Sequence, residues 1–381
     1  MTSLTEDIRS EQVTESREFI TMNREQNNLF WNSRVKNLSP YIPGEQPKDR
    51  RFIKLNTNEN PYPPSPKVIE AIQKTVNDDL RLYPDPECVE FRRAIAECYG
   101  VKIEQVFAGN GSDEILAFAF GAFFESKGQP VLFPDITYSF YPVYADLWDI
   151  SHNTIPLCED FTININDYKI SSGGAALPNP NAPTGIAVPL DDLLSLAQFL
   201  EKQGKVLIVD EAYAAFGAQS AVSHIELHPN LLVVHTLSKS ASLAGLRAGF
   251  AIGSEQLTEG LRRIRDSFNS YTLDRLALAG GTAAIKDREY YNEANKRVIA
   301  TRERTAKTLK ELGFYVLPSS ANFLFVKPSN TSGAELYAAL REKGILVRHF
   351  NKERIGDFLR VSMGTDTEME TFIKACREIT K

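Results

Sequence analysis

The sequence has few cysteines, no long apolar run and no excess of basic residues. Its four cysteines form no C-x-x-C pair, which argues against a zinc ribbon or a disulfide scaffold and suits a reducing cytoplasm. The longest apolar run, Ile115 to Phe124, is too short to span a bilayer and is better interpreted as a buried helix. The formal net charge is -6, whereas nucleic-acid binders are more often basic. We therefore expect a cytoplasmic protein that binds neither membranes nor nucleic acid.

The N-terminal thirty or so residues are polar and weakly patterned, and they lack the apolar segment of a signal peptide. We expect a flexible arm there. The rest of the 381 residues, with 43% hydrophobic and 24% charged residues overall, has the composition of a globular protein. The length is sufficient for more than one domain-sized unit.

Short apolar runs alternate with amphipathic helical patterns through the middle of the chain. VLFPD, KVLIVDEAY and LLVVHTLSK are typical of buried strands, and LDDLLSLAQFLEKQG is typical of a helix that ends at a glycine. This alternation predicts an α/β fold with a mainly parallel sheet that helices cover on both faces. From about residue 285 a long charged helix followed by shorter strands predicts a smaller α+β domain. We divide the chain into an N-terminal arm (1–50), a large domain (66–284) and a small domain (51–65 and 285–381).

Polar and reactive side chains follow two neighbouring predicted strands. VLIV leads into Asp210 and then Tyr213, and LLVVH leads into Thr236, Ser238 and Lys239. Ligands of an open parallel sheet bind beyond the carboxyl ends of its strands, so these groups are expected to share one edge.

A third unit, QVFAGNGSDEILAF, passes from a strand through a glycine-rich turn into a helix. The first turn of that helix would present free amides, near Ser112 and Asp113, to an anion. Arg247 follows Lys239 by eight residues and could bind the same anion with a forked contact. A lysine amine, a carboxylate and a phosphate cradle are what pyridoxal phosphate (PLP) needs for its aldehyde, its pyridine nitrogen and its phosphate.

Each of these signals has a plainer interpretation. A lysine after a strand is usually a surface lysine, and an aspartate at a strand end is usually a helix cap. GNG also suits a dinucleotide site with Asp135 as the ribose-binding acid, although Glu114 stands where the third glycine belongs. HIELH differs from the zinc pattern H-E-x-x-H and is more typical of a solvated turn, so no metal site is expected.

From about Asn37 to the C-terminus the sequence resembles the fold-type-I aminotransferases, and within them the histidinol-phosphate aminotransferases. The matching stretches are NLSPY, LNTNENPYPPSP, RLYPDP, AGNGSDE, PNAPTG, VDEAYAAF, TLSKSASLAGLRAG, SSANFLF and FLRVSMG. The resemblance implies a seven-stranded sheet in the large domain and reversible amino transfer between histidinol phosphate and 2-oxoglutarate.

The resemblance also implies a role for individual residues. Lys239 would bind PLP as a Schiff base, Asp210 would pair with the pyridine nitrogen, and Tyr213 would bind the phenolate oxygen. Tyr138 would stack on the ring, and the cofactor phosphate would be held by Ser112, Asp113, Thr236, Ser238, Arg247 and, from a neighbouring subunit, Tyr83. A homodimer with shared sites follows. The substrate pocket would contain Arg360, Arg348, Tyr41 and Asn322.

The chain departs from the family pattern at Ala182, where an asparagine usually precedes PTG and contacts the phenolate oxygen. Asn181 or Asn179 could substitute for it, or Tyr213 could act alone.

Several alternatives remain on sequence grounds. The same scaffold could carry an aromatic amino-acid aminotransferase or a PLP-dependent amino-acid-phosphate decarboxylase. A PLP-binding module of a regulator would instead bring a basic helix-turn-helix, which the polar N-terminus lacks. Fold alone does not choose among these activities.

Overall fold

The computed structural model describes residues 30–47 and 52–380, which fall into two compact units. The first unit ends at Tyr41, and its described part, from residue 30, contains the short helix α2 (Ser33–Asn37), whose N-terminal cap is the side chain of Asn32. The second unit begins at Ile42 and contains all the other elements. Most of the predicted arm (1–50) therefore lies outside the described residues.

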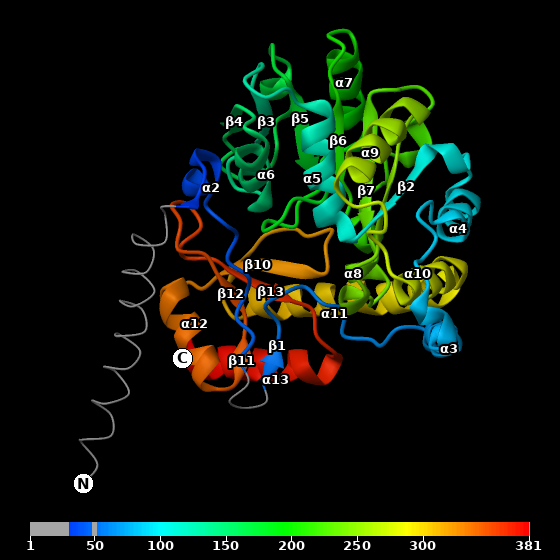
Figure 1. The fold of residues 1–381 in the computed structure, drawn as a ribbon. Coiled ribbons are helices and arrows are strands. Elements are labelled where there is room, and N and C mark those ends of the chain that lie inside the picture. Colours follow the sequence, from blue (N-terminus) through cyan, green and yellow to red (C-terminus); the bar gives the residue numbers. More distant parts are fainter. Residues whose placement is uncertain (1–29, 48–51, 381) are drawn as a thin grey trace. The chain divides into compact units, whose positions relative to one another are not determined.

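A seven-stranded sheet forms the centre of the second unit (Figure 1). Its order is β2-β8-β7-β6-β5-β3-β4, and the strands from β4 to β7 run parallel, whereas β8 is antiparallel to both of its neighbours. The predicted mainly parallel α/β sheet is thus confirmed. The strands are β2 (Val106–Gly109), β3 (Val131–Pro134), β4 (His152–Ile155), β5 (Gly174–Pro178), β6 (Leu207–Asp210), β7 (Leu231–Thr236) and β8 (Gly249–Ile252).

Helices cover both faces of this sheet because successive side chains of each strand point to opposite sides. Ile208 of β6 belongs to a core with residues of α5, α6 and α9, whereas its neighbour Val209 belongs to a second core with residues of α4 and α7. The run Ile115 to Phe124 lies largely in α5, as predicted. The helices that pack on the two faces and at the edge of this sheet are α3 (Pro66–Thr75), α4 (Val89–Tyr99), α5 (Gly111–Phe123), α6 (Phe140–Trp148), α7 (Leu190–Glu201), α8 (Leu237–Ser240), α9 (Glu255–Phe268) and α10 (Arg275–Lys286).

A separate antiparallel sheet, in the order β12-β13-β10-β9, packs with α11, α12 and α13 around its own core. It lies below the large sheet in the view of Figure 1. The elements are β9 (Tyr315–Val316), β10 (Phe323–Lys327), β12 (Arg348–His349), β13 (Leu359–Ser362), α11 (Arg288–Glu311), α12 (Gly333–Glu342) and α13 (Asp366–Ile379). β1 (Ile53–Lys54) pairs in parallel with β11 (Ile345–Leu346) beside this sheet. The exact domain boundaries at residues 51, 66 and 285 stay a prediction.

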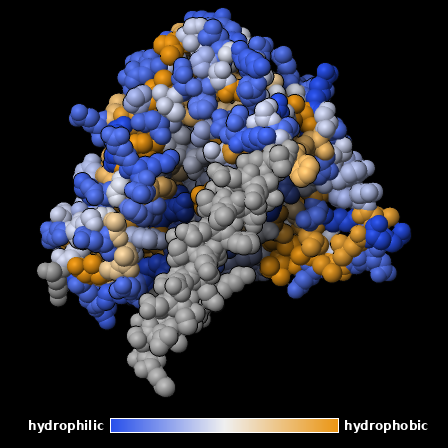
Figure 2. Space-filling view, turned by 60° about the vertical axis from the view of Figure 1, so that its left-hand side comes forward, coloured by the Kyte–Doolittle hydropathy of each residue, from blue (hydrophilic) through white to orange (hydrophobic). Residues whose placement is uncertain are grey.

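No helix within the described residues is long and apolar enough to cross a membrane. Figure 2 shows one face of the molecule, which is mostly hydrophilic and carries a hydrophobic patch at its lower right.

Candidate active site

The ends of β6 and β7 bring the central predicted residues to one edge of the large sheet. The two strands are parallel neighbours, and Asp210, the last residue of β6, is in register with Val234 of β7. Two residues further along β7 the chain turns at Thr236 into α8, the short helix that contains Lys239. The shared edge predicted from the sequence is therefore present.

Asp210 is buried and lies in a nearly apolar setting. Its carboxylate accepts a hydrogen bond from the backbone N–H of Ala212 at 3.1 Å, and the hydroxyl of Tyr141 lies 3.4 Å from the other oxygen. Burial raises the pKa of Asp210 to about 7, because the charged form loses solvation, and the bond from Ala212 opposes this shift. A positively charged group facing this carboxylate would stabilise its ionised form.

Lys239 is half-buried, and its Nζ donates a hydrogen bond to the backbone oxygen of Thr57 at 3.0 Å. Burial, assisted by the charge of Arg360, lowers the pKa of Lys239 to about 8, and the carboxylate of Glu59 opposes the shift. An appreciable fraction of this amine is thus unprotonated near neutral pH, which a nucleophilic lysine requires.

Tyr213 follows Asp210 at the same edge, and its hydroxyl oxygen accepts a hydrogen bond from Nδ2 of Asn58 at 2.9 Å. Its ring packs edge-on against Phe323, with 5.2 Å between centroids. Burial raises the pKa of Tyr213, whereas Arg360 and the hydrogen bond from Asn58 lower it. The phenol therefore stays protonated at neutral pH.

The predicted anion cradle lies at the N-terminus of α5. Ser112 and Asp113 occupy the first turn, and the Asp113 carboxylate pairs with the Arg247 guanidinium at 2.8 Å. Arg247 also donates to the hydroxyl of Ser238 at 3.3 Å, and the Thr236 hydroxyl donates to the same oxygen at 2.9 Å. Helix amides, a guanidinium and two hydroxyls thus converge, which suits a phosphate.

Two glycines make this convergence possible. Gly111 has a φ of +78°, and a Cβ atom there would lie 2.6 Å from the Arg247 guanidinium. A Cβ atom on Gly249 would lie 2.7 Å from the carbonyl carbon of Gly111 and 2.8 Å from the backbone nitrogen of Ser112. A side chain at position 111 would therefore displace the arginine, and one at position 249 would collide with the backbone at the start of α5.

Tyr138, predicted to stack on the cofactor, lies beside this cradle. Its hydroxyl donates to the Asp113 carboxylate, and its ring packs edge-on against Tyr141 with 5.8 Å between centroids. Tyr138 and Tyr141 therefore connect Asp113 with Asp210.

The sequence left Asn181, Asn179 and Tyr213 as candidates for the contact that Ala182 cannot make with the phenolate oxygen. The structure shows how the two asparagines are used. Asn181 uses its amide within its own loop: Nδ2 donates to the Ile136 carbonyl and to Thr184, and Oδ1 accepts from Thr137. Oδ1 of Asn179 accepts from the backbone of Val188, which belongs to the core on the sheet face opposite to that of Tyr141.

Ala182 itself packs in a small apolar cluster with Ala321, Phe323 and Tyr213. Tyr213 is therefore the polar side chain that packs beside Ala182 in this cluster.

Arg360 and Arg348 face each other across β13 and β12, where they are direct partners in the strand register. Both guanidinium groups lie 5.7 Å from the centroid of the Phe350 ring, and Arg360 also donates to the backbone oxygen of Asn56 at 2.9 Å. Like charges placed directly opposite are destabilising. The pair is therefore well suited to an anionic ligand.

Three other predicted residues have different settings. Asn322 is fully buried and donates from Nδ2 to the backbone oxygen of Asn58 at 3.0 Å, so it helps to fix the backbone next to the site. Tyr83 is 77% exposed and stacks on Tyr271, with 4.6 Å between centroids. Tyr41 is the last residue of the first unit, and its part in the pocket stays a prediction.

The sequence analysis missed the segment from Asn56 to Asn60 as a functional element. Its backbone oxygens accept from Arg360 and Lys239, the Asn58 side chain binds Tyr213, and the Asn60 side chain donates to the Lys239 carbonyl at 3.0 Å. The signal in the sequence was the presence of three asparagines within five residues. In the structure two of them, Asn56 and Asn58, are only 1% exposed. Buried amides need partners, and here the partners are the predicted site residues.

The comparison with known proteins agrees with this geometry. Residues 50–376 match the family model described as aminotransferase class I and II. The chain belongs to this aminotransferase family. It is 54% identical over 349 residues to a histidinol-phosphate aminotransferase of Clostridium acetobutylicum, covering 92% of this chain and 98% of that protein. A histidinol-phosphate aminotransferase of Methylococcus capsulatus is 53% identical, with the same coverage.

Solved structures share the fold of this aminotransferase at low sequence identity. The histidinol-phosphate aminotransferase of Sinorhizobium meliloti, crystallised with pyridoxal 5'-phosphate, has a TM-score of 0.83 at 23% identity and covers 92% of this chain and 98% of its own. A histidinol-phosphate aminotransferase structure from Clostridium acetobutylicum has a TM-score of 0.80 at 23% identity, covering 86% and 99%.

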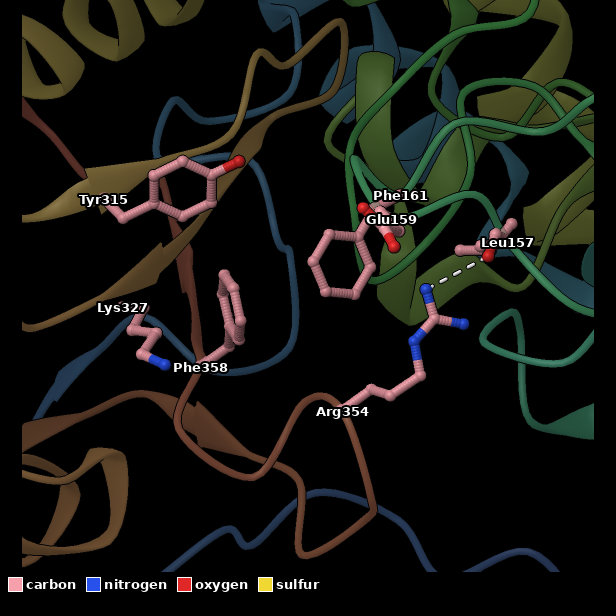
Figure 3. A pocket seen from close by; sticks show the side chains of 7 residues that line it. All are labelled: Leu157, Glu159, Phe161, Tyr315, Lys327, Arg354 and Phe358. Carbon is pink, nitrogen blue, oxygen red and sulfur yellow. Dashed lines mark hydrogen bonds between the residues drawn. The ribbon is translucent and has the colours of Figure 1, made fainter.

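A surface pocket of about 600 Å³ is lined by none of the predicted site residues of this aminotransferase (Figure 3). On one side of it, Arg354 donates to the backbone oxygens of Leu157 at 3.0 Å and Cys158 at 2.8 Å, and pairs with Asp135 at 3.3 Å. Arg354 lies in the loop between β12 and β13. It therefore ties the strands that carry the two facing arginines to the large sheet. The residues that line the pocket are Leu157, Glu159, Phe161, Tyr315, Lys327, Arg354 and Phe358.

Proposed function

We propose that this protein is a PLP-dependent aminotransferase that exchanges an amino group between histidinol phosphate and 2-oxoglutarate. The observation that carries the proposal is Lys239, an amine with a pKa of about 8 at the edge of the sheet where Asp210 ends the neighbouring strand. The identity of 53% to 54% with relatives named histidinol-phosphate aminotransferase supports the choice of substrate.

The residues at this edge fit PLP. Lys239 would bind its aldehyde, and Asp210 would face the pyridine nitrogen, whose positive charge would favour the ionised carboxylate. When bound, the cofactor supplies a sink for the electrons released at the substrate carbon. Tyr213 would donate its phenolic proton to the ring oxygen, and Tyr138 would cover one face of the ring.

The cradle at α5 would hold the cofactor phosphate. The amides of Ser112 and Asp113, the hydroxyls of Thr236 and Ser238, and the Arg247 guanidinium surround one position. The Asp113 carboxylate is already neutralised by Arg247, so it does not oppose an anion at the helix terminus. Asn181 would support the loop beside the ring rather than contact it.

Lys239 would also move the proton during amino transfer. Once released by the substrate amine, Nζ of Lys239 would be free to take a proton from the substrate carbon and to return it to a neighbouring atom. Because its pKa lies near the working pH, Lys239 can serve as base and then as acid.

The facing arginines would bind the acidic end of each substrate. An anion between Arg348 and Arg360 relieves their mutual repulsion, and a guanidinium forks equally well onto a phosphate or a carboxylate. Arg360 would bind both substrates and Arg348 one of them. Asn322 would hold the adjacent backbone in place.

We propose a cytoplasmic homodimer in which Tyr83 reaches the cofactor phosphate of the partner subunit. In support, Tyr83 is exposed together with Leu80 and Leu82 of the same short segment, at 53% and 44%. Apolar side chains grouped on a surface are typical of an interface. The neighbouring Tyr271 is also exposed, at 43%.

The deciding experiment mixes PLP-loaded protein with histidinol phosphate in the absence of an oxo acid. We expect the visible absorbance of the bound cofactor to shift to that of its amine form, and 2-oxoglutarate to restore it while glutamate appears. Lys239→Ala serves as the control that shows neither change. Release of carbon dioxide from an amino-acid phosphate would instead indicate a decarboxylase, and a response to aromatic amino acids alone would indicate the aromatic aminotransferase.

A further inference from the structure

The hydrogen bond between Asn58 and Tyr213 has a defined direction. The Nδ2 group of Asn58 donates, and the hydroxyl oxygen of Tyr213 accepts, at 2.9 Å. An amide nitrogen carries only donors, so the phenolic proton of Tyr213 cannot point back toward it. The proton is left to donate to another acceptor.

The orientation of the Asn58 amide is itself fixed by Ser362. The hydroxyl of Ser362 donates to Oδ1 of Asn58 at 2.9 Å, and the Ser362 hydroxyl oxygen in turn accepts from the backbone N–H of Asn58 at 2.8 Å. With Oδ1 engaged by a donor, Nδ2 must be the end that meets Tyr213. In this arrangement each bond of the network joins a donor to an acceptor.

We propose that Asn58 is a positioning residue that aims the phenolic proton of Tyr213 at the cofactor's ring oxygen, in a chain where Ala182 replaces the usual asparagine. The proposal rests on the proposed function, since it concerns the same cofactor. Asn181 uses both ends of its amide within its own loop, Oδ1 of Asn179 accepts from Val188 on the opposite face of the sheet, and Ala182 offers no polar side-chain atom. Tyr213 is thus left to act with Asn58.

The backbone at Asn58 also favours this residue. Its φ is +56°, in the left-handed region that asparagine, aspartate and glycine tolerate better than other residues. The side chain is buried to 1% exposure. Asn58→Asp and Asn58→Gly therefore preserve the backbone conformation, while the first reverses the polarity of the hydrogen bond and the second removes it.

The first test uses cofactor-free protein with ¹³Cζ-labelled tyrosine, in which Tyr213→Phe assigns the Tyr213 signal. Asn58→Asp should raise the pKa of Tyr213 by about one unit or more, because the introduced carboxylate accepts the phenolic proton and disfavours the phenolate. Asn58→Gly should raise it less. Asn153→Asp, at an exposed position of β4, controls for the added charge and should leave it unchanged.

The second test uses the PLP-loaded enzyme and follows its visible absorbance against pH. If Tyr213 no longer donates to the ring oxygen, Nζ of Lys239, which would be joined to the aldehyde carbon of the cofactor, would hold its proton more tightly. The absorbance midpoint should then rise by about one pH unit in Asn58→Asp. Its kcat should fall about tenfold or more for both substrates, with little change in KM, because the lost contact acts at the ring and not at the arginines.

The outcomes separate this inference from the proposed function. Wild-type protein that binds no PLP or fails to react with histidinol phosphate overturns the proposed function, whereas the tyrosine titration still reports on Asn58. Unchanged Tyr213 titration and an unchanged absorbance midpoint in Asn58→Asp, in an enzyme that remains active, overturn the inference alone. If Asn58→Asp fails to fold, Asn58→Gly takes its place in both tests. An unshifted absorbance midpoint in Asn58→Gly then overturns the inference.

Discussion

The amine of Lys239 donates a hydrogen bond to the backbone oxygen of Thr57, 3.0 Å away in space and 182 residues away in sequence. Covalent binding of a cofactor would replace this bond, because Nζ would then be committed to a new partner. The lysine is therefore held in place before the cofactor arrives by an interaction that involves no charged partner. Its surroundings keep it reactive, since burial and Arg360 both disfavour the ammonium form.

Lys239→Ala should abolish amino transfer and the visible absorbance of bound PLP, because another residue would have to supply the amine at this position. Borohydride reduction of the wild-type enzyme followed by peptide mapping should place the modification on Lys239. A borohydride-stable adduct that persists in Lys239→Ala would contradict the assignment.

Lys239→Met should stabilise the cofactor-free protein, and more at pH 7 than near pH 10.5. The pKa of Lys239 is about 8 in the folded state, against about 10.4 for an unfolded chain, so protonation favours unfolding. Wild-type stability should thus fall as the pH decreases through this window, by about 1 kcal/mol or more, whereas the methionine variant lacks this loss. Urea unfolding at the two pH values measures the difference, and equal stabilisation at both would refute it.

Asp210→Asn should reduce kcat about 10²- to 10³-fold while keeping the fold, because a neutral amide cannot balance a pyridinium charge. The cofactor-free variant should also lose a pH dependence of stability. The folded pKa of about 7 exceeds the unfolded value, so wild-type stability falls as the pH rises from about 3.9 through 7. Half-reaction kinetics and urea unfolding at pH 5 and 8 test the two effects. Near-normal turnover would reduce Asp210 to a structural role.

Tyr83→Ala should impair cofactor retention, although Tyr83 is exposed in its own chain. If the residue serves the partner subunit, mixing inactive Lys239→Ala and Tyr83→Ala subunits should restore some activity after exchange, since one site in each mixed dimer keeps both groups. Exchange is confirmed with differently tagged subunits. Proven exchange without recovery would place Tyr83 outside any shared site.

Arg360→Lys should lower kcat/KM for histidinol phosphate and for glutamate alike, by about tenfold to a hundredfold, because lysine keeps the charge but loses the forked contact. Arg348→Ala should instead change the ratio of the two values. Stopped-flow half-reactions with each substrate measure both. If Arg360→Lys impairs only one half-reaction, the two arginines divide the substrates differently.

The large sheet could be predicted because its strands are signalled locally. VLIVD and LLVVH are continuous apolar runs, and a parallel strand covered on both faces needs such a run. Because Asp210 and Lys239 follow the carboxyl ends of two such strands, the sequence alone was enough to predict that they share one edge of the sheet.

Other features depend on partners distant in the sequence. GILVRHF looks like one strand but is divided at Val347, since Ile345 pairs with Ile53 and Arg348 pairs with Arg360. Asp113 was expected to contribute only its amide, whereas its carboxylate binds Arg247, 134 residues away. The bond from Asn58 to Tyr213 spans 155 residues, and no local pattern announces it.

The contacts of the Asn56–Asn60 segment also constrain the order in which the molecule can be built. Asn56 and Asn58 each bind a residue of β13 that lies 304 positions further along the chain. During synthesis the segment leaves the ribosome early and must wait for almost the entire polypeptide before it meets these partners. Contacts of such long range are slow to form, because the loop must close before they stabilise it. A nascent chain that already contains Lys239, Asp210 and Arg247 therefore still lacks a finished site, and loss of the last few dozen residues would leave the lysine without the architecture that orients Tyr213.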